Sequence, residues 1–250
     1  MNSMIHMRLK GRLGNVCFQT ATAIALSLDY NIPFTLSSTT KDQVMQPLYF
    51  QHLVKPLPDL PAKWLREMQH NYQPIVLGPE YDGYNIMMDG FYQSFKYFEH
   101  RRDEVLDMMG LFPDILNDCI GIHVRRGDYL TIPNKHIDNT GQFMEDAIDY
   151  FALDGWDNFV VFSDDIPWCK EYFNKFNGLN FEFSERNDPL LDLKNLSYCR
   201  HFINSSSTFS LFASWLGRAK DKICISPKEW FQSTQPENTA DIVPPNYIRF

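Results

Sequence analysis

The sequence predicts an α/β protein built on parallel sheets, because short apolar stretches alternate with helical segments along much of the chain. Polar residues cluster directly after four of these stretches, as they do at the carboxyl ends of parallel strands that bind a ligand. The pattern resets around residues 111–114, which predicts a domain boundary near residue 115. We therefore expect two units, 1–115 and 116–250, and a chain of 250 residues is long enough for both.

The first unit is expected to hold a strand over 4–10, a polar turn at 11–15, a helix that runs to about residue 28, and a strand over 32–36. The helix has an apolar face at helical spacing, and Asn15 stands where an N-cap residue would. Prolines interrupt 37–80, where only 62–69 predicts a short helix. The chain favours helix again after Phe91.

The second unit is expected to contain strands over 118–124, 158–162, 200–203 and 222–225, with helices over about 141–153, 168–177 and 209–216. The first three strands are almost continuously apolar, which is typical of strands buried on both faces of a parallel sheet. Gly217 is placed as the residue that ends the last helix.

Composition excludes several classes of protein. The net charge of −8 disfavours general nucleic-acid binding, which would require a basic surface. The five cysteines are odd in number and form no C-x-x-C pair, so a disulfide framework or a structural zinc site is not expected. No apolar run is long enough for a membrane helix, and the start lacks the features of a signal peptide. We expect a cytoplasmic protein, although a chain trimmed of an anchor would look the same.

The first polar cluster is the turn at 11–15, which includes Gly14 and Asn15. Its glycines would let the backbone approach a ligand, and the following helix N-terminus offers free N–H groups to an anion. The pattern is neither G-x-G-x-x-G nor a P-loop. A simple strand-to-helix turn therefore explains the spacing as well as a binding loop does.

The second cluster follows the strand over 118–124. His123 and Arg125 should share one face of the strand and Arg126 the other. Arginine is the side chain best suited to grip phosphate oxygens in two places. One arginine could instead pair with Asp128 in a structural ion pair, which would leave the other for a ligand. His123 considered alone would be an ordinary core histidine.

The third cluster contains Asp164 and Asp165. Paired acids at a strand end could bind a metal, a ribose hydroxyl or the N–H groups of guanine. One of them could instead cap the next helix, which has Pro167 in its first turn. Because no D-x-D triplet and no histidine-rich set accompanies them, a metal is the weakest of the three ligands.

The fourth cluster is a run of hydroxyl residues that ends in Ser207, Thr208, Phe209 and Ser210. One hydroxyl is expected to cap the following helix. The remaining hydroxyls, together with the N–H groups of the helix N-terminus, would suit a diphosphate. The run also matches the N-glycosylation pattern, which we discount in the absence of a secretory signal.

Taken together, these residues resemble the α-1,2-fucosyltransferase family (glycosyltransferase family 11). The family's G-x-L-G-N-Q-M-F-Q corresponds to residues 11–19, with Val16 and Cys17 as departures. Its G-Y-F-Q-S-x-K-Y-F corresponds to 90–98 with two aromatics exchanged. H-x-R-R-G-D-Y and F-S-D-D-x-x-W are intact at 123–129 and 162–168, and an N-S-S-T-F-S type segment ends at Ser210.

The resemblance implies a GT-B-like fold of two Rossmann-like lobes with a donor cleft between them. It also implies a GDP-fucose donor and no required metal or other cofactor. The first lobe would face the acceptor and the second would bind GDP-fucose. Carried over by motif, Arg125 binds the diphosphate with Ser210, His123 and Asp164 or Asp165 lie near guanine, and Asn15 faces the donor. Gly14, Arg126, Ser207, Thr208 and Phe209 complete the predicted donor contacts.

The implied reaction is an inverting transfer of fucose to a glycan hydroxyl, O2 of a terminal galactose being the expected acceptor. Arg125, Ser210 and the helix N-terminus near Thr208 would stabilise the leaving diphosphate. Asp128 is the nearest motif acid to serve as general base, but the base is not assigned. A lipid-linked acceptor would bring the protein to a membrane surface. The alternatives are another linkage, such as α-1,6, and a non-catalytic protein that binds a GDP-sugar or a glycan.

Overall fold

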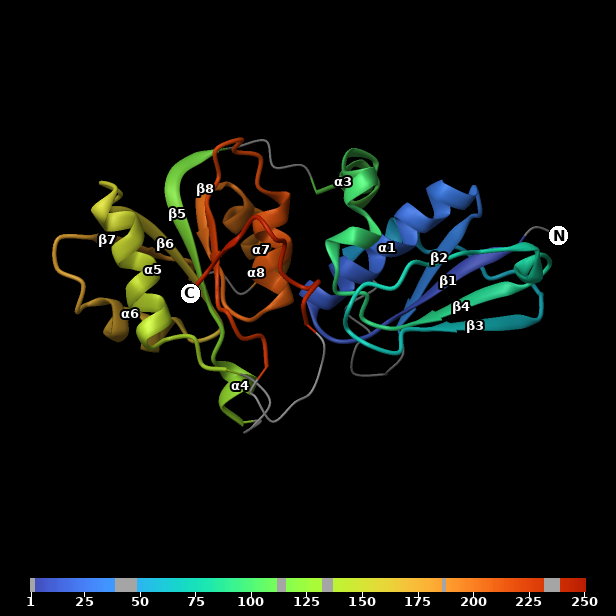
Figure 1. Cartoon of the computed structure of the whole chain (residues 1–250), viewed down its shortest axis with the longest axis horizontal. Helices are drawn as coiled ribbons and strands as arrows, with labels where there is room; N and C mark the ends of the chain where they lie inside the picture. The colour runs from blue at the N-terminus through green and yellow to red at the C-terminus, as the bar shows by residue number, and fades with distance from the viewer. Residues whose placement is uncertain (1–2, 39–48, 112–115, 132–136, 186–187, 232–238) are drawn as a thin grey trace. The chain divides into compact units, whose positions relative to one another are not determined.

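The computed structural model describes residues 3–38, 49–111, 116–131, 137–185, 188–231 and 239–250. The chain forms two compact units, each with its own parallel sheet (Figure 1). The first unit is Met1–Phe112 with Asn238–Pro244, and the second is Pro113–Glu237 with Pro245–Phe250. The first of these divisions, between Phe112 and Pro113, lies close to the boundary expected near residue 115. The return of residues 238–244 to the first unit was not expected from the sequence.

The first unit is built on a four-stranded parallel sheet in the order β2-β1-β4-β3. Its strands are β1 (Met4–Leu9), β2 (Phe34–Ser38), β3 (Ala62–Arg66) and β4 (Asn85–Asp89). Alternate residues of β1 are fully buried, namely Ile5, Met7 and Leu9. The alanine-rich helix α1 (Leu13–Tyr30) packs against β1, and every residue of its first half except Asn15 is buried.

Two expectations for the first unit are wrong. Helix α1 begins at Leu13 with Arg12 as its N-cap residue, so Asn15 lies inside the first turn and is not the N-cap. Residues 62–66 form the edge strand β3, where a helix over 62–69 was expected, because pairing with β4 overrides the weak local preference. The described residues of this unit also form the short 3-10 helices η2 (Gln51–Leu53), η3 (Pro79–Tyr81), η4 (Phe95–Tyr97) and η5 (Glu99–Arg101), and the helix α3 (Arg102–Met109).

The second unit is built on a six-stranded parallel sheet in the order β10-β9-β8-β5-β6-β7. Its strands are β5 (Asn117–Val124), β6 (Asn158–Ser163), β7 (Asn180–Phe183), β8 (Cys199–Ile203), β9 (Cys224–Ser226) and β10 (Ile248–Arg249). Counted from β5, this is the doubly wound order of dinucleotide-binding domains. The strand order reverses between β5 and β8, and ligands of such sheets bind outside the carboxyl ends at that point.

Helices cover both faces of the second sheet. Figure 1 shows α5 and α6 on one face and α7 and α8 on the other. The helices are α4 (Gly127–Thr131), α5 (Gln142–Leu153), α6 (Ile166–Phe173), α7 (Pro189–Ser197) and α8 (Thr208–Leu216). The apolar residues of β5 pack in a core with α5, α6 and β6. The predicted parallel α/β fold is therefore confirmed.

The state of the cysteines and the character of the helices relate to two of the expectations from composition. All five cysteines are free and buried. Within the described ranges, every helix is too short or too polar to cross a bilayer.

Gly121 of β5 provides a test of the packing in the second unit. A Cβ there would lie 2.5 Å from Cδ1 of Leu196 and 3.0 Å from Sγ of Cys199, and both neighbours are almost fully buried. We expect Gly121→Ala to lower the free energy of unfolding by about 1–3 kcal/mol, since neither neighbour has room to move. Gly141→Ala is the matched control, because its Cβ would meet no atom within 4 Å. An equal loss of unfolding free energy in both variants, measured by urea denaturation, would contradict the packing argument.

Candidate functional site

The predicted second and fourth polar clusters meet at the point where the strand order of the second sheet reverses. His123 is the second-last residue of β5, and the turn 204–207 directly follows β8. A hydrogen bond of 2.7 Å joins Nδ1 of His123 to Oγ of Ser205. The two neighbouring strand ends are therefore fixed to each other by side chains. This is the position at which a doubly wound sheet binds its ligand.

His123 is an uncharged residue of this site. Its ring is buried and stacks on Phe209 of α8, with 5.0 Å between the ring centroids. Burial, together with the positive charge of Arg125, lowers the pKa of His123 to about 3. The neutral imidazole has one donor and one acceptor nitrogen, so it can hold Ser205 through one and offer the other to a polar ligand.

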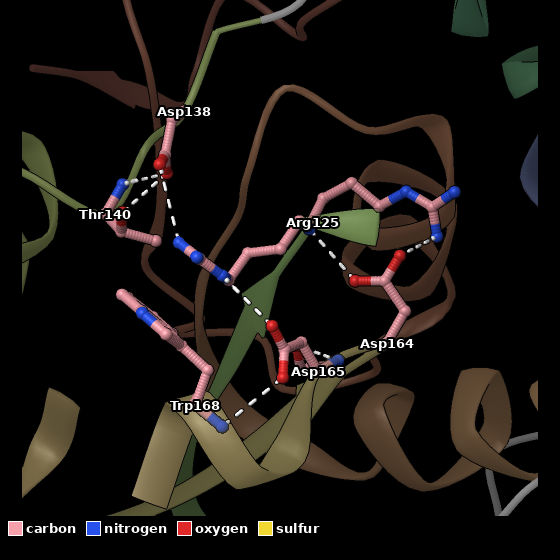
Figure 2. A network of polar contacts seen from close by, with 8 residues as sticks. Arg125, Asp138, Thr140, Asp164, Asp165 and Trp168 are labelled. Atoms are coloured by element: carbon pink, nitrogen blue, oxygen red, sulfur yellow. Dashed lines mark hydrogen bonds and ion pairs between the residues drawn. The ribbon is translucent and has the colours of Figure 1, made fainter. Parts of the chain in front are cut away.

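Asp164 joins the end of β6 to both predicted arginines. Its Oδ2 forms an ion pair of 2.7 Å with Nη1 of Arg125, and its Oδ1 accepts a hydrogen bond of 2.9 Å from the backbone N–H of Arg126 (Figure 2). A Cβ on Gly127 would lie only 2.5 Å from Oδ2 of Asp164. The glycine of the R-R-G-D motif is thus explained by the close approach of this carboxylate.

Arg126 leaves the strand end in another direction and is held by three groups. Its Nε donates to Oδ2 of Asp165 at 3.3 Å, and its Nη1 lies 3.5 Å from Oδ2 of Asp138. Its guanidinium carbon lies 3.6 Å from the ring centroid of Trp168. The expected partner was Asp128, whose side chain falls outside the described part of the structure, as do any contacts that it makes.

Asp165 caps the next helix, as considered above, and also forms the ion pair with Arg126. Its Oδ1 accepts the N–H of Trp168 at 3.3 Å, so it is the N-cap residue of α6. Its own N–H donates to Oγ of Ser163. Among the described residues, no group of three or more His, Cys, Asp or Glu side chains is placed to hold a metal ion. Contacts of Asp164 or Asp165 with guanine stay a prediction.

The hydroxyl run at 204–210 mostly holds its own turn. Ser207 is the N-cap residue of α8 and accepts the N–H of Phe209. The buried hydroxyl of Ser210 donates to the carbonyl oxygens of Ser205 and Ser207 at 3.3 and 3.1 Å. Thr208 is the first residue of α8, whose N-terminus faces the same strand edge. Direct contact of Ser207, Thr208, Phe209 or Ser210 with a diphosphate stays a prediction.

The predicted residues of the first unit lie in the first turn of α1. Gly14 and Asn15 follow Gly11, which has a left-handed backbone (φ 81°) and would place a Cβ 2.2 Å from Nδ2 of Asn15. Oδ1 of Asn15 accepts a hydrogen bond of 2.9 Å from Nε2 of Gln93. The two N-terminal motifs, at 11–19 and 90–98, are therefore in direct contact.

Glu67 is a residue that the sequence analysis missed. Its carboxylate accepts the N–H groups of Phe91 and Tyr92 at 2.6 and 2.9 Å. Tyr92 has a left-handed backbone (φ 51°), which is costly for a bulky residue. Burial raises the pKa of Glu67. No sequence signal pointed to it, because it lies in the segment for which a helix was expected.

A pocket of about 270 Å³ lies in the second unit, beside the contacts of Arg126 and Ser206. Its lining residues are Ile137, Asp138, Asn139, Gly141, Gln142, Phe143, Pro227, Lys228, Glu229 and Phe250. None of the site residues predicted from the sequence lines it. It adjoins them through Asp138, which contacts Arg126, and through Asn139, which accepts the N–H of Ser206 at 2.8 Å.

The buried His123 predicts a specific dependence of stability on pH. Its pKa in the folded chain lies below the ordinary value of 6.5, so its contribution to stability is complete above pH 6.5 and is lost as the pH falls toward 3. We expect the difference in unfolding free energy between the wild type and His123→Asn to shrink by about 1 kcal/mol between pH 6.5 and 5.5. Urea denaturation at both pH values measures it. The same free-energy difference at both pH values would show that His123 titrates alike in the folded and unfolded chains.

Comparison with known proteins agrees with the motifs. The family model described as glycosyl transferase family 11 matches residues 1–249. The chain is similar to an alpha-1,2-colitosyltransferase from Escherichia coli, at 26% identity over 99% of each chain. It is also similar to galactoside 2-alpha-L-fucosyltransferase Sec1 from Mus musculus, at 26% identity over 85% of this chain. The match spans 64% of the mouse enzyme.

Solved structures show the same fold at low identity. Fucosyltransferase NodZ from Bradyrhizobium matches with a TM-score of 0.52 and 13% identity, over 86% of this chain and 94% of that one. FUT1 from Arabidopsis thaliana in complex with GDP matches with a TM-score of 0.51 and 13% identity, over 97% of this chain and 74% of that one. The fold is thus that of GT-B-like fucosyltransferases. With the family model covering nearly its whole length, the chain belongs to glycosyl transferase family 11.

Proposed function

We propose that this protein transfers L-fucose from GDP-β-L-fucose to O2 of a terminal galactose and forms an α-1,2 linkage. The observation that supports it most is the placement of Arg125 at the end of β5, where the strand order reverses and where Asp164 holds its guanidinium. The mouse relative is named as a galactoside 2-alpha-L-fucosyltransferase, and the Arabidopsis structure contains GDP.

The proposed donor site lies at the carboxyl ends of β5, β6 and β8. Arg125 and the N-terminus of α8 bind the diphosphate, since both offer positively polarised N–H groups. His123 and the acids after β6 lie on the guanine side. Gly14 and Asn15 are proposed donor contacts from the first unit, which is otherwise assigned to the acceptor. Asn15 is held for this by Gln93.

The proposed reaction inverts the configuration at C1 of fucose. The acceptor hydroxyl oxygen forms a bond to C1 while the bond from C1 to the phosphate oxygen breaks, and the electron pair of that bond leaves with GDP. Negative charge therefore grows on the diphosphate, where fixed N–H donors are most effective. Asp164 and Asp165 are bound to arginines, so we propose that these cations, and no divalent metal, stabilise the leaving group. The proton of the acceptor hydroxyl passes to a base, for which Asp128 remains the proposed motif acid.

A second donor has an observation in its favour. The Escherichia coli relative matched over 99% of both chains is named as a colitosyltransferase. Colitosyl transfer to the same acceptor position is therefore the alternative reaction. Non-catalytic binding of a GDP-sugar remains the alternative outside the enzymes.

The function is tested by supplying GDP-fucose and nucleotide-activated colitose in parallel, with a panel of galactose-terminated acceptors and with EDTA present throughout. We expect an α-1,2-fucosylated product, identified by NMR of the new linkage. Preferential use of activated colitose would show that colitose, and not fucose, is the transferred sugar. A 1,6 linkage in the product would show that the acceptor position is not O2 of galactose. Binding of GDP without any turnover would favour the non-catalytic alternative, and activity restored only by added Mg²⁺ or Mn²⁺ would contradict metal independence.

Arg125 provides the most specific test of the donor site. A guanidinium has five N–H donors, so it can bind Asp164 and still reach the diphosphate, which a single ammonium cannot do in the same geometry. We expect Arg125→Lys to lower kcat by about 10²–10³, nearly as much as Arg125→Ala, with a smaller change in the KM for the donor. Steady-state kinetics and melting curves measure this. A folded lysine variant with wild-type kcat would rule out the assignment.

A further inference from the structure

One face of the first sheet has a cationic character that the proposed donor chemistry does not use. Odd-numbered residues of β1 point toward α1, and the even-numbered ones point to the opposite face. The pairing of β1 with β4 and of β4 with β3 puts His6, Met87 and Trp64 in one row on that face. A contact of 3.3 Å between Nδ1 of His6 and Sδ of Met87 agrees with this register.

Trp64 lies on the edge strand β3, on this face of the sheet, and is 43% exposed. The guanidinium carbons of Arg8 and Arg66 each lie 5.1 Å from the centroid of its ring. Arg66 is exposed and Arg8 is half-buried. We call Arg8, Trp64 and Arg66 the Trp64 surface. The same indole therefore contacts both guanidinium groups.

The charge of the Trp64 surface is not balanced by neighbouring acids. In the described parts of the chain, neither Arg8 nor Arg66 forms an ion pair with a carboxylate. Asp89 is the register partner of Arg66, but its Oδ1 binds Nζ of Lys10 at 3.1 Å. His6 adds no positive charge at neutral pH, because burial and the charge of Arg8 lower its pKa. Two like charges around one ring repel each other, and an oxyanion between them would relieve that repulsion.

The location of the surface fits a substrate. Arg8 and Arg66 lie at or near the carboxyl ends of β1 and β3, which is the edge where parallel sheets bind ligands. The chain as a whole has a net charge of −8, whereas these two arginines have no carboxylate partner among the described residues. A small anionic group suits this pair better than an extended polyanion, which would meet the acidic remainder of the surface.

We propose that the Trp64 surface binds an anionic group of the acceptor glycan, either the carboxylate of an acidic sugar or a phosphate attached to the saccharide. This inference rests on the proposed function, because it assumes that the first unit receives a glycan. The two guanidinium groups grip the oxyanion, and the exposed part of the indole lies against the apolar face of the adjoining sugar ring. The enzyme would thereby select a charged acceptor over a neutral one.

Binding of three probes to the wild-type chain without donor tests the proposal: lactose, lactose that carries a glucuronate residue, and lactose 1-phosphate. We expect at least one anionic probe to bind at least tenfold more tightly than lactose at low salt, with the advantage falling as NaCl is raised. A preference for the glucuronate probe identifies an acidic sugar as the source of the anion, and a preference for the phosphate probe identifies a sugar phosphate. Equal binding of all three overturns the proposal.

Arg66→Gln should abolish most of the tenfold advantage, and Trp64→Leu should weaken it, because the two guanidinium groups lose their common support. Arg101→Gln is the matched control, since it removes one arginine charge from the same unit at a site already paired with Asp29 and Glu104. Equal losses in Arg66→Gln and Arg101→Gln would overturn the proposal. Calorimetric binding needs no turnover, so an enzyme that binds the anionic probe but transfers no sugar contradicts the proposed function and leaves this surface assigned.

Discussion

The carboxylate of Asp164 is the contact on which the ligand-binding edge of the second unit depends. It receives the side chain of Arg125 and the backbone N–H of Arg126, so one group fixes both the direction of the guanidinium and the path of the chain after β5. Hydrogen bonds to a charged group contribute about 1.5–3 kcal/mol each, and loss of one partner would leave a partly buried charge unpaired. Gly127 follows from this contact, because any side chain there would collide with the carboxylate.

Two adjacent arginines can serve different purposes because side chains alternate at the end of a strand. Arg125 points to the side of His123 and the turn after β8. Arg126 is enclosed by Asp165, Asp138 and the ring of Trp168, and it ties the ends of β5 and β6 to the segment before α5. Asp138 is itself held by the N–H and hydroxyl of Thr140 (Figure 2). The result is a positive charge whose position is set before any ligand binds, which is the condition for effective stabilisation of a leaving anion.

Sequence reasoning succeeded where an element is both apolar and followed by a polar cluster, as in β5, β6 and β8. It failed for β3, whose alternate exposure and single partner strand give little local signal, and for β7, which has only four residues. Several of the motif residues lie together in the folded chain, but the sequence did not indicate which residues they contact there. Asp138 and Glu67 come from segments without a motif, and only the folded chain brings them to Arg126 and to the 90–93 turn. The sequence also did not indicate that the hydroxyl of Ser210 donates to carbonyl oxygens of its own turn.

Both units have a side-chain hydrogen bond at the carboxyl edge of the sheet. In each unit, a side-chain hydrogen bond joins residues at or just beyond the carboxyl ends of two neighbouring strands, β1 and β4 in the first unit and β5 and β8 in the second. Asn15 and Gln93 form this bond in the first unit, and His123 and Ser205 form it in the second. In the first unit the backbone of Tyr92, next to Gln93, is left-handed, which costs about 1–3 kcal/mol, and Glu67 offsets this cost by accepting two N–H groups. A fold retains strain of this kind where a loop must keep one conformation, so the 90–93 turn is fixed by the carboxylate of Glu67 against the local preference of Tyr92.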